Sequence, residues 1–152
     1  MHIRTDDLTN PAVHRLLEEH MRHMHELSPA ESVHALDLDA LRQPEITFWT
    51  IWSADAALMG CGALKSHGDG HAEIKSMRTA ETHRGKGVGQ AMLDHILVEA
   101  RKRSYTRLSL ETGPAPGFAS ALRLYSRFGF TECGPFADYA EDPYSVFMTM
   151  AL

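Results

Sequence analysis

A glycine-rich hexapeptide, Arg84-Gly85-Lys86-Gly87-Val88-Gly89, has the composition of a loop that binds an anion. It follows a strand-compatible segment, residues 71–79, and precedes residues 90–103, whose apolar side chains recur at helical spacing. Glycines let the backbone turn sharply and approach a ligand without a Cβ clash. Because the first turn of a helix presents unpaired N–H groups, we expect this loop to bind a negatively charged group, above all a pyrophosphate.

Three kinds of phosphate-binding loop use this arrangement, and the flanking residues separate them. A Walker-type loop requires Gly-Lys followed by Ser or Thr, whereas Lys86 is followed by Gly87. A dinucleotide-binding loop requires a third glycine where this chain has Gln90. Such a loop also lies in the first βα unit of a parallel sheet, whereas this one lies past the middle of the chain. The remaining pattern, Arg-x-x-Gly-x-Gly after a strand, resembles the coenzyme A loop of the GNAT superfamily of N-acetyltransferases.

Two further segments extend this resemblance. Ala72-Glu73-Ile74 is similar to the histone-acetylating branch, in which a glutamate on this strand is the general base. Residues 121–130, Ala-Leu-Arg-Leu-Tyr-Ser-Arg-Phe-Gly-Phe, are similar to the late helix and turn of the family, in which a tyrosine faces the coenzyme sulfur. The chain is therefore identified as a small, bacterial-type GNAT member with a single N-acetyltransferase domain over residues 1–152.

The resemblance implies an acetyl-CoA-dependent N-acetyltransferase that moves the acetyl group directly to a primary amine in a ternary complex. Acetyl-CoA is the co-substrate, and no metal is implied. In the family, two neighbouring strands splay apart, and exposed backbone N–H groups pair with the pantetheine arm. By position, the pantetheine contacts fall on Met77, Arg78 and Thr79, and the pyrophosphate contacts on Arg84, Gly85, Lys86, Gly87, Val88 and Gly89.

An amine attacks a thioester only when it is neutral, so the site needs a base. For a lysine-like amine, deprotonation near pH 7 costs about 5 kcal/mol. Glu73 is the predicted base, acting through a water, with a surface carboxylate as its ordinary alternative. Glu111, at the end of the neighbouring strand, is the second candidate, although a purely structural role is the favoured interpretation for this residue.

Tyr125 is the predicted acid that protonates the departing thiolate. The alternative is a tyrosine buried on an amphipathic helix between Leu122 and Phe128. Phe118 stands seven residues earlier, where many relatives carry asparagine, so the acceptor-side geometry cannot be transferred from the family.

Four histidines, His14, His20, His23 and His25, gather in one predicted helix. Two of them could share a metal, but a metal site needs a third ligand and supporting groups. A solvated or cleft-facing cluster is therefore expected. Cys61 and Cys133 match no ligand spacing, and neither is expected to carry the acyl group.

The bulk composition sets wider limits. The chain has 152 residues, 43% of them hydrophobic and 23% charged, with a formal net charge of −5. This charge argues against nucleic acid as a partner. No long apolar run or signal-like N-terminus is present, which predicts a cytoplasmic protein without a membrane partner. The acceptor is expected to be a small-molecule, protein or peptide amine, and a homodimer is possible.

The expected elements form an α+β domain with a mostly antiparallel sheet flanked by helices, in the order βααββββαβαββ. Its predicted helices cover residues 11–27, 32–42 and 90–103, and a last helix and turn lie within residues 121–130. Closely spaced strand-like runs indicate an antiparallel meander. A splayed strand pair, residues 71–79 with the strand from residue 107, should bind the coenzyme. The alternative function is a catalytically inactive coenzyme A or acyl-CoA sensor or regulatory module.

Overall fold

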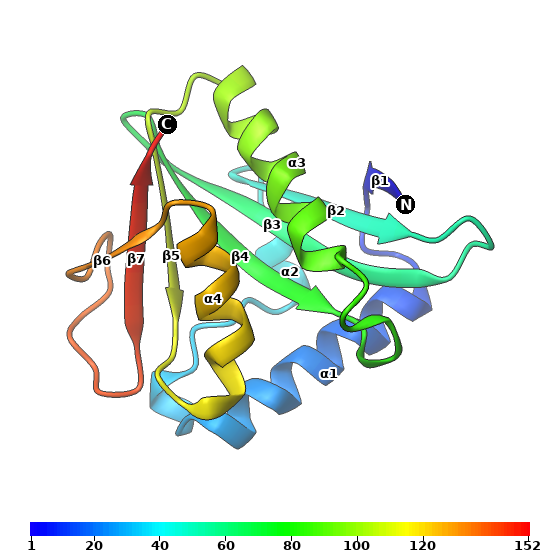
Figure 1. The fold of residues 1–152 in the computed structure, drawn as a ribbon, viewed down its shortest axis with the longest axis horizontal. Coiled ribbons are helices and arrows are strands. Elements are labelled where there is room, and N and C mark those ends of the chain that lie inside the picture. Colours follow the sequence, from blue (N-terminus) through cyan, green and yellow to red (C-terminus); the bar gives the residue numbers. More distant parts are fainter.

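The computed structural model describes residues 1–152 as a seven-stranded sheet with helices on both faces (Figure 1). The strand order is β1-β2-β3-β4-β5-β7-β6, and every neighbouring pair is antiparallel except β4 and β5. The elements, in chain order, are β1 (His2–Thr5), α1 (Pro11–Leu27), α2 (Leu38–Leu41), β2 (Ile46–Trp52), β3 (Leu58–Gly68), β4 (His71–Thr79), α3 (Val88–Lys102), β5 (Arg107–Thr112), α4 (Ala119–Arg127), β6 (Thr131–Cys133) and β7 (Val146–Ala151). The predicted α+β class with a mostly antiparallel sheet is confirmed.

Alternation along the strands gives the sheet two apolar faces, each covered by helices. In β2, Trp49 packs in the cluster that includes α3 and α4, whereas Phe48 packs in the cluster that includes α1 and α2. The first cluster is the larger, with 17 buried residues against eight. No helix combines the length and the apolar character needed to cross a membrane.

Helix α1 begins and ends where its sequence predicts. The side chain of Asn10 accepts a hydrogen bond from the N–H of Ala12 at 2.8 Å, and Pro11 occupies the first helical position. The helix ends at Leu27, and Ser28 is already extended before Pro29. These caps fix the position of the helix that forms one wall of the site.

A β-bulge interrupts β4 in the middle of the strand. Ser76 and Met77 together oppose Gly62, because the register shifts between the pairs Cys61–Arg78 and Ala63–Lys75. Ser76 has a φ of 53°, an uncommon conformation for a residue with a side chain. Such bulges bend a strand and redirect its side chains, so the second half of β4 turns away from its original line.

Strands β4 and β5 separate after a short parallel ladder. Pairing runs from His71 opposite Arg107 to Ile74 opposite Leu110 and then stops, just before the bulge. Strand β5 continues to Thr112 in its pairing with β7. The remainder of β4 therefore has no ladder partner on its β5 side, and the predicted splayed strand pair is confirmed.

Two details of the predicted element order are wrong. Three strands, not four, lie between α2 and α3, namely β2, β3 and β4. The helix predicted over residues 32–42 is reduced to a 3₁₀ turn at Ala30–Ser32 and the four-residue α2. Tertiary hydrogen bonds account for the second difference. Ser32 Oγ donates to Asp142 Oδ2 at 2.6 Å, and the carbonyl of His34 accepts from Lys75 Nζ at 3.0 Å, so this segment bonds to other parts of the fold.

Candidate active site

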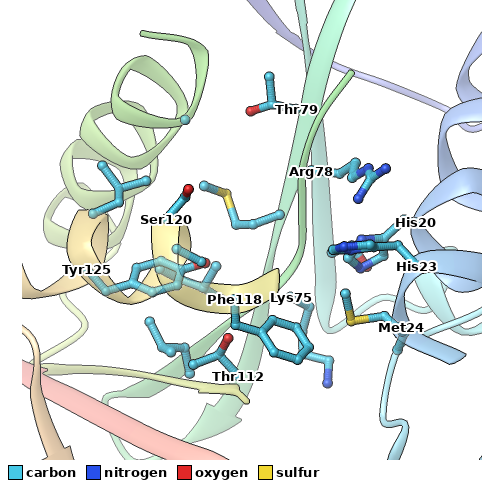
Figure 2. Close-up of a pocket in the computed structure, with 18 of the residues that line it drawn as sticks. His20, His23, Met24, Lys75, Arg78, Thr79, Thr112, Phe118, Ser120 and Tyr125 are labelled. Carbon is cyan, nitrogen blue, oxygen red and sulfur yellow. The ribbon is translucent and has the colours of Figure 1, made fainter. Parts of the chain in front are cut away.

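A cavity of about 440 Å³ lies where β4 and β5 separate. Figure 2 shows His20 and His23 projecting from α1 on one side of it, with Ser120 and Tyr125 from α4 on the other. Its lining also includes the second half of β4, the glycine-rich loop and the end of β5. Segments separated by about a hundred residues thus meet around one volume that suits a small-molecule ligand.

The glycine-rich loop turns into α3 with its backbone accessible. Gly85 and Gly87 have φ values of 75° and 79°, and a Cβ at either position would meet nothing within 4 Å. Gly87 caps the helix without any side-chain hydrogen bond to the first-turn N–H groups. Those groups remain available to an anion, as the sequence predicts.

Eight of the nine predicted coenzyme-binding residues line this cavity. They are Met77, Arg78, Thr79, Arg84, Gly85, Gly87, Val88 and Gly89. The ninth, Lys86, does not line it and is exposed, with its Nζ 3.4 Å from Nδ1 of His83. Gly89 also lets α3 and α4 approach closely, because a Cβ there would lie 3.1 Å from Cδ2 of Leu124.

Tyr125 reaches the same cavity from α4. Its side chain is 6% exposed, and its ring packs edge-on against Phe130 with the centroids 5.7 Å apart. A tyrosine hydroxyl is protonated at neutral pH, and burial raises the pKa of the Tyr125 hydroxyl further. A protonated phenol in a cavity wall can donate a hydrogen bond or a proton.

The two candidate bases occupy different environments. Glu111 lines the cavity, and burial raises the pKa of its carboxyl to about 7. Glu73 is 1% exposed and does not line the cavity. Its carboxylate accepts from Tyr139 Oη at 2.6 Å, and it lies 2.8 Å from His67 Nε2 and 3.4 Å from Lys75 Nζ. The surface position that was the ordinary alternative for Glu73 is therefore excluded.

The profile of the acetyltransferase (GNAT) family matches residues 11–130. The chain belongs to this GNAT family. It is 57% identical over 152 residues to the uncharacterized N-acetyltransferase YsnE of Bacillus subtilis (strain 168), with both chains fully covered. It is 49% identical over 150 residues to the uncharacterized N-acetyltransferase YedL of Escherichia coli (strain K12), covering 99% of this chain and 94% of the relative.

A solved structure supports the fold. A GNAT family acetyltransferase from Elizabethkingia anophelis, with acetyl-CoA bound, superposes with a TM-score of 0.69 at 18% identity, covering 99% of this chain and 97% of that one. The resemblance drawn from the loop and the two flanking motifs is confirmed, and the chain is an N-acetyltransferase.

Cys61 lines the cavity of this GNAT enzyme, which its sequence position did not predict. Its thiol donates to the carbonyl of Ser76 at 3.2 Å, and burial raises its pKa to about 12. Since the thiolate is the nucleophilic form of cysteine, this environment suppresses nucleophilic reactivity. Cys133 lies on β6, away from the cavity.

The four histidines of α1 separate into different surroundings. His20 and His23 line the cavity, which confirms a cleft-facing position for these two. His14 Nε2 contacts the carbonyl of Leu8, and His25 is exposed. No group of three His, Cys, Asp or Glu side chains is placed to hold a metal ion.

Several polar residues of the cavity wall were not predicted from the sequence. They are Lys75, Ser76, Thr112, Ser120 and Arg127. For Lys75 and Ser76, which lie on β4, the sequence does contain an indication of their position. The apolar residues Ala72 and Ile74 occupy even positions, whereas the next one, Met77, is odd. Because strand side chains alternate with a period of two, this change of parity indicates an inserted residue, and hence the bulge.

Proposed function

We propose that the enzyme, acting as one catalytic domain over residues 1–152, transfers acetyl from acetyl-CoA directly to a primary amine in a ternary complex. One observation carries the proposal: a single cavity contains the glycine-rich loop, the unpaired half of β4, Tyr125 and Glu111. An anion-binding loop, a strand-like backbone edge, an acid and a base are the parts that this transfer requires.

The chain's residues fit coenzyme A. The first-turn N–H groups of α3 and the open glycines suit a pyrophosphate, and the unpaired edge of β4 suits an extended pantetheine arm. Acetyl-CoA supplies the activated thioester. An N–H near Met77, at the bulge, would stabilise the oxyanion that develops on the thioester oxygen.

For the base, Glu111 fits the cavity better than Glu73. A base is most effective when its pKa lies near the working pH, and the pKa of Glu111 is about 7. Glu73, by contrast, does not line the cavity, and its carboxylate already contacts Tyr139, Lys75 and His67. In this proposal Glu111 accepts the acceptor's proton, and Glu73 positions Lys75 at the cavity wall.

Glu111 and Tyr125 supply the proton transfers that the acetyl transfer requires. After the ammonium group has lost one proton to water, the neutral amine nitrogen bonds to the thioester carbonyl carbon, its second proton passes to Glu111, and the C–S bond breaks. Tyr125 protonates the departing sulfur, and proton exchange with solvent then returns Tyr125 and Glu111 to their starting states. Cys61 is not used, because its raised pKa disfavours the thiolate.

The test is thiol release from acetyl-CoA over a panel of primary amines, with acetyl-CoA binding measured in parallel by calorimetry. Release that requires an amine, together with an acetylated amine found by mass spectrometry, would support direct transfer. Tight acetyl-CoA binding without thiol release for any amine would favour the alternative function, a catalytically inactive acyl-CoA sensor. Loss of binding on substituting the loop glycines, and not on substituting exposed glycines elsewhere, would connect affinity to the loop.

A further inference from the structure

Three buried nitrogens on the α1 side of the cavity have no hydrogen-bond partner within the protein. They are Nδ1 of His20, Nδ1 of His23 and Nε of Arg78, and all three residues line the cavity. His20 is 9% exposed. Buried polar atoms are usually paired, because an unpaired one loses its hydration without compensation. Three such atoms in one cavity wall indicate a site for a polar ligand group.

The chemistry of Arg78 defines that group. An arginine Nε–H is a donor only and keeps its charge, so the ligand atom must accept a hydrogen bond and is favoured if negative. The positive charge of Arg78 also disfavours a metal ion at this position. Burial, and next the charge of Arg78, lower the pKa of His20 to about 4, so this ring is neutral and offers one donor.

The charge balance favours a single negative charge. Glu19 Oε1 already accepts from Nη2 of Arg78 at 3.0 Å, which neutralises part of the guanidinium charge. Lys75, whose charge also acts on His20, has its ammonium group taken by Glu73, Tyr139 and the carbonyl of His34. Arg84, whose charge also acts on His23, belongs to the glycine-rich loop that is proposed to bind the pyrophosphate. A monoanion with two oxygens suits the remaining donors better than a dianion.

The neighbouring surface is apolar. The ring of His23 lies 6.3 Å from that of Phe118, centroid to centroid, and Met24 lines the same part of the cavity. Figure 2 shows His20, His23 and Arg78 on one side with Met24 beside them, across the cavity from Tyr125 and Ser120. The anion-binding wall therefore stands opposite the wall that carries the proposed acid.

We propose that the acceptor carries a carboxylate as well as its amine, and that Arg78, His20 and His23 bind this carboxylate. The substrate class is an amino carboxylate with an apolar side group, which packs on Met24 and Phe118. The proposal rests on the proposed function, since it names the acceptor of that transfer.

The first experiment compares L-phenylalanine with L-phenylalaninamide and 2-phenylethylamine, and L-methionine with its amide, by thiol release. The amide is a stringent comparison, because its less basic amine is neutral in a larger fraction of molecules. A charge-assisted hydrogen bond predicts that kcat/KM for the acid exceeds that for the amide by about tenfold or more. Equal rates for acid and amide would overturn the proposal.

Variants connect the preference to its residues. Arg78→Gln should abolish the preference for the acid over the amide, and Arg78→Lys should keep part of this preference. Arg22→Gln is the matched control, since Arg22 is an exposed arginine on α1, the helix that carries His20 and His23, and does not line the cavity. A similar loss of preference in Arg22→Gln would indicate a long-range charge effect and overturn the assignment. Thermal melting confirms that each variant is folded.

A binding measurement separates this proposal from the proposed function. Calorimetry with coenzyme A-saturated enzyme compares 3-phenylpropionate with 3-phenylpropanamide, neither of which can be acetylated on an amine. Tighter binding of the carboxylate by about tenfold, lost in Arg78→Gln, would support the anion site even if no amine releases thiol. Equal binding, or no binding of either compound, would overturn it even if acetyl transfer occurs.

Discussion

Burial acts on two groups of the cavity wall with different consequences. It raises the pKa of Glu111 to about 7 and so brings a base near neutrality. It also raises the pKa of Tyr125, which makes this phenol a weaker acid that gives up its proton only to a strong base such as a departing thiolate in a dry site. The residue types were predictable from the sequence, but their pKa values depend on what surrounds them.

Tyr125→Phe removes the proposed acid while keeping the ring. We expect kcat to fall by about a hundredfold, because general acid–base catalysis contributes roughly that factor or more, with the KM for acetyl-CoA nearly unchanged. Steady-state kinetics with a verified acceptor measures both. An unchanged kcat would remove Tyr125 from the chemistry and leave it a packing role against Phe130.

Glu111→Gln and Glu73→Gln distinguish the two candidate bases. For wild type we expect kcat/KM to rise with pH through about 7, as Glu111 loses its proton. In Glu111→Gln this rise of kcat/KM with pH should disappear, and kcat/KM should fall by about a hundredfold. In Glu73→Gln the rise with pH should remain.

Glu73→Gln should act mainly on stability. It leaves Lys75 without its buried counter-charge, and we expect a loss of about 3 kcal/mol in the free energy of unfolding, measured in urea. If Glu73→Gln abolished the rise of kcat/KM with pH and Glu111→Gln did not, Glu73 would be the base.

At the scale of elements, the sequence predicts what periodicity and caps determine. Helix α1 and strand β4 have the expected bounds, residues 11–27 and 71–79, and β5 begins at residue 107 as expected. The helix expected over residues 32–42 failed because Ser32 and His34 bond to Asp142 and Lys75, which are distant in sequence. Such competition between local and tertiary hydrogen bonds leaves no mark in a local pattern.

Gly87→Ala tests the loop at this scale. A residue with a Cβ in the left-handed conformation is strained, so we expect a loss of about 1 kcal/mol in the free energy of unfolding and a higher KM for acetyl-CoA. Gly68→Ala is the matched control, because Gly68 has a φ of 80°, equally open surroundings and no contact with the cavity. It should lose similar stability and leave the KM unchanged. A KM change in both variants would contradict a role specific to the loop.

At the scale of the whole molecule, the cavity is assembled by topology. Its walls come from α1, the bulged half of β4, the loop, the end of β5 and α4. The family motifs predicted the loop and Tyr125, since each lies within one continuous segment. The meeting of Arg78 with His20 and His23 needs α1 to pack across β4, and no spacing in the sequence encodes that contact.

The raised pKa of Glu111 makes a prediction for the stability of the whole fold. The folded state binds the Glu111 proton more tightly, with a pKa of about 7 against the ordinary 4.5. The contribution to stability is therefore fully present below pH 4.5 and is lost as the pH rises through about 7. Glu111→Gln has no such proton, so subtracting its free energy of unfolding from that of wild type cancels the other titrations. We expect this difference to fall by about 2 kcal/mol between pH 4.5 and 8, after allowance for partial exposure. Urea unfolding of both proteins across this range measures it, and a difference that stays constant or rises would mean that burial does not hold the proton on Glu111.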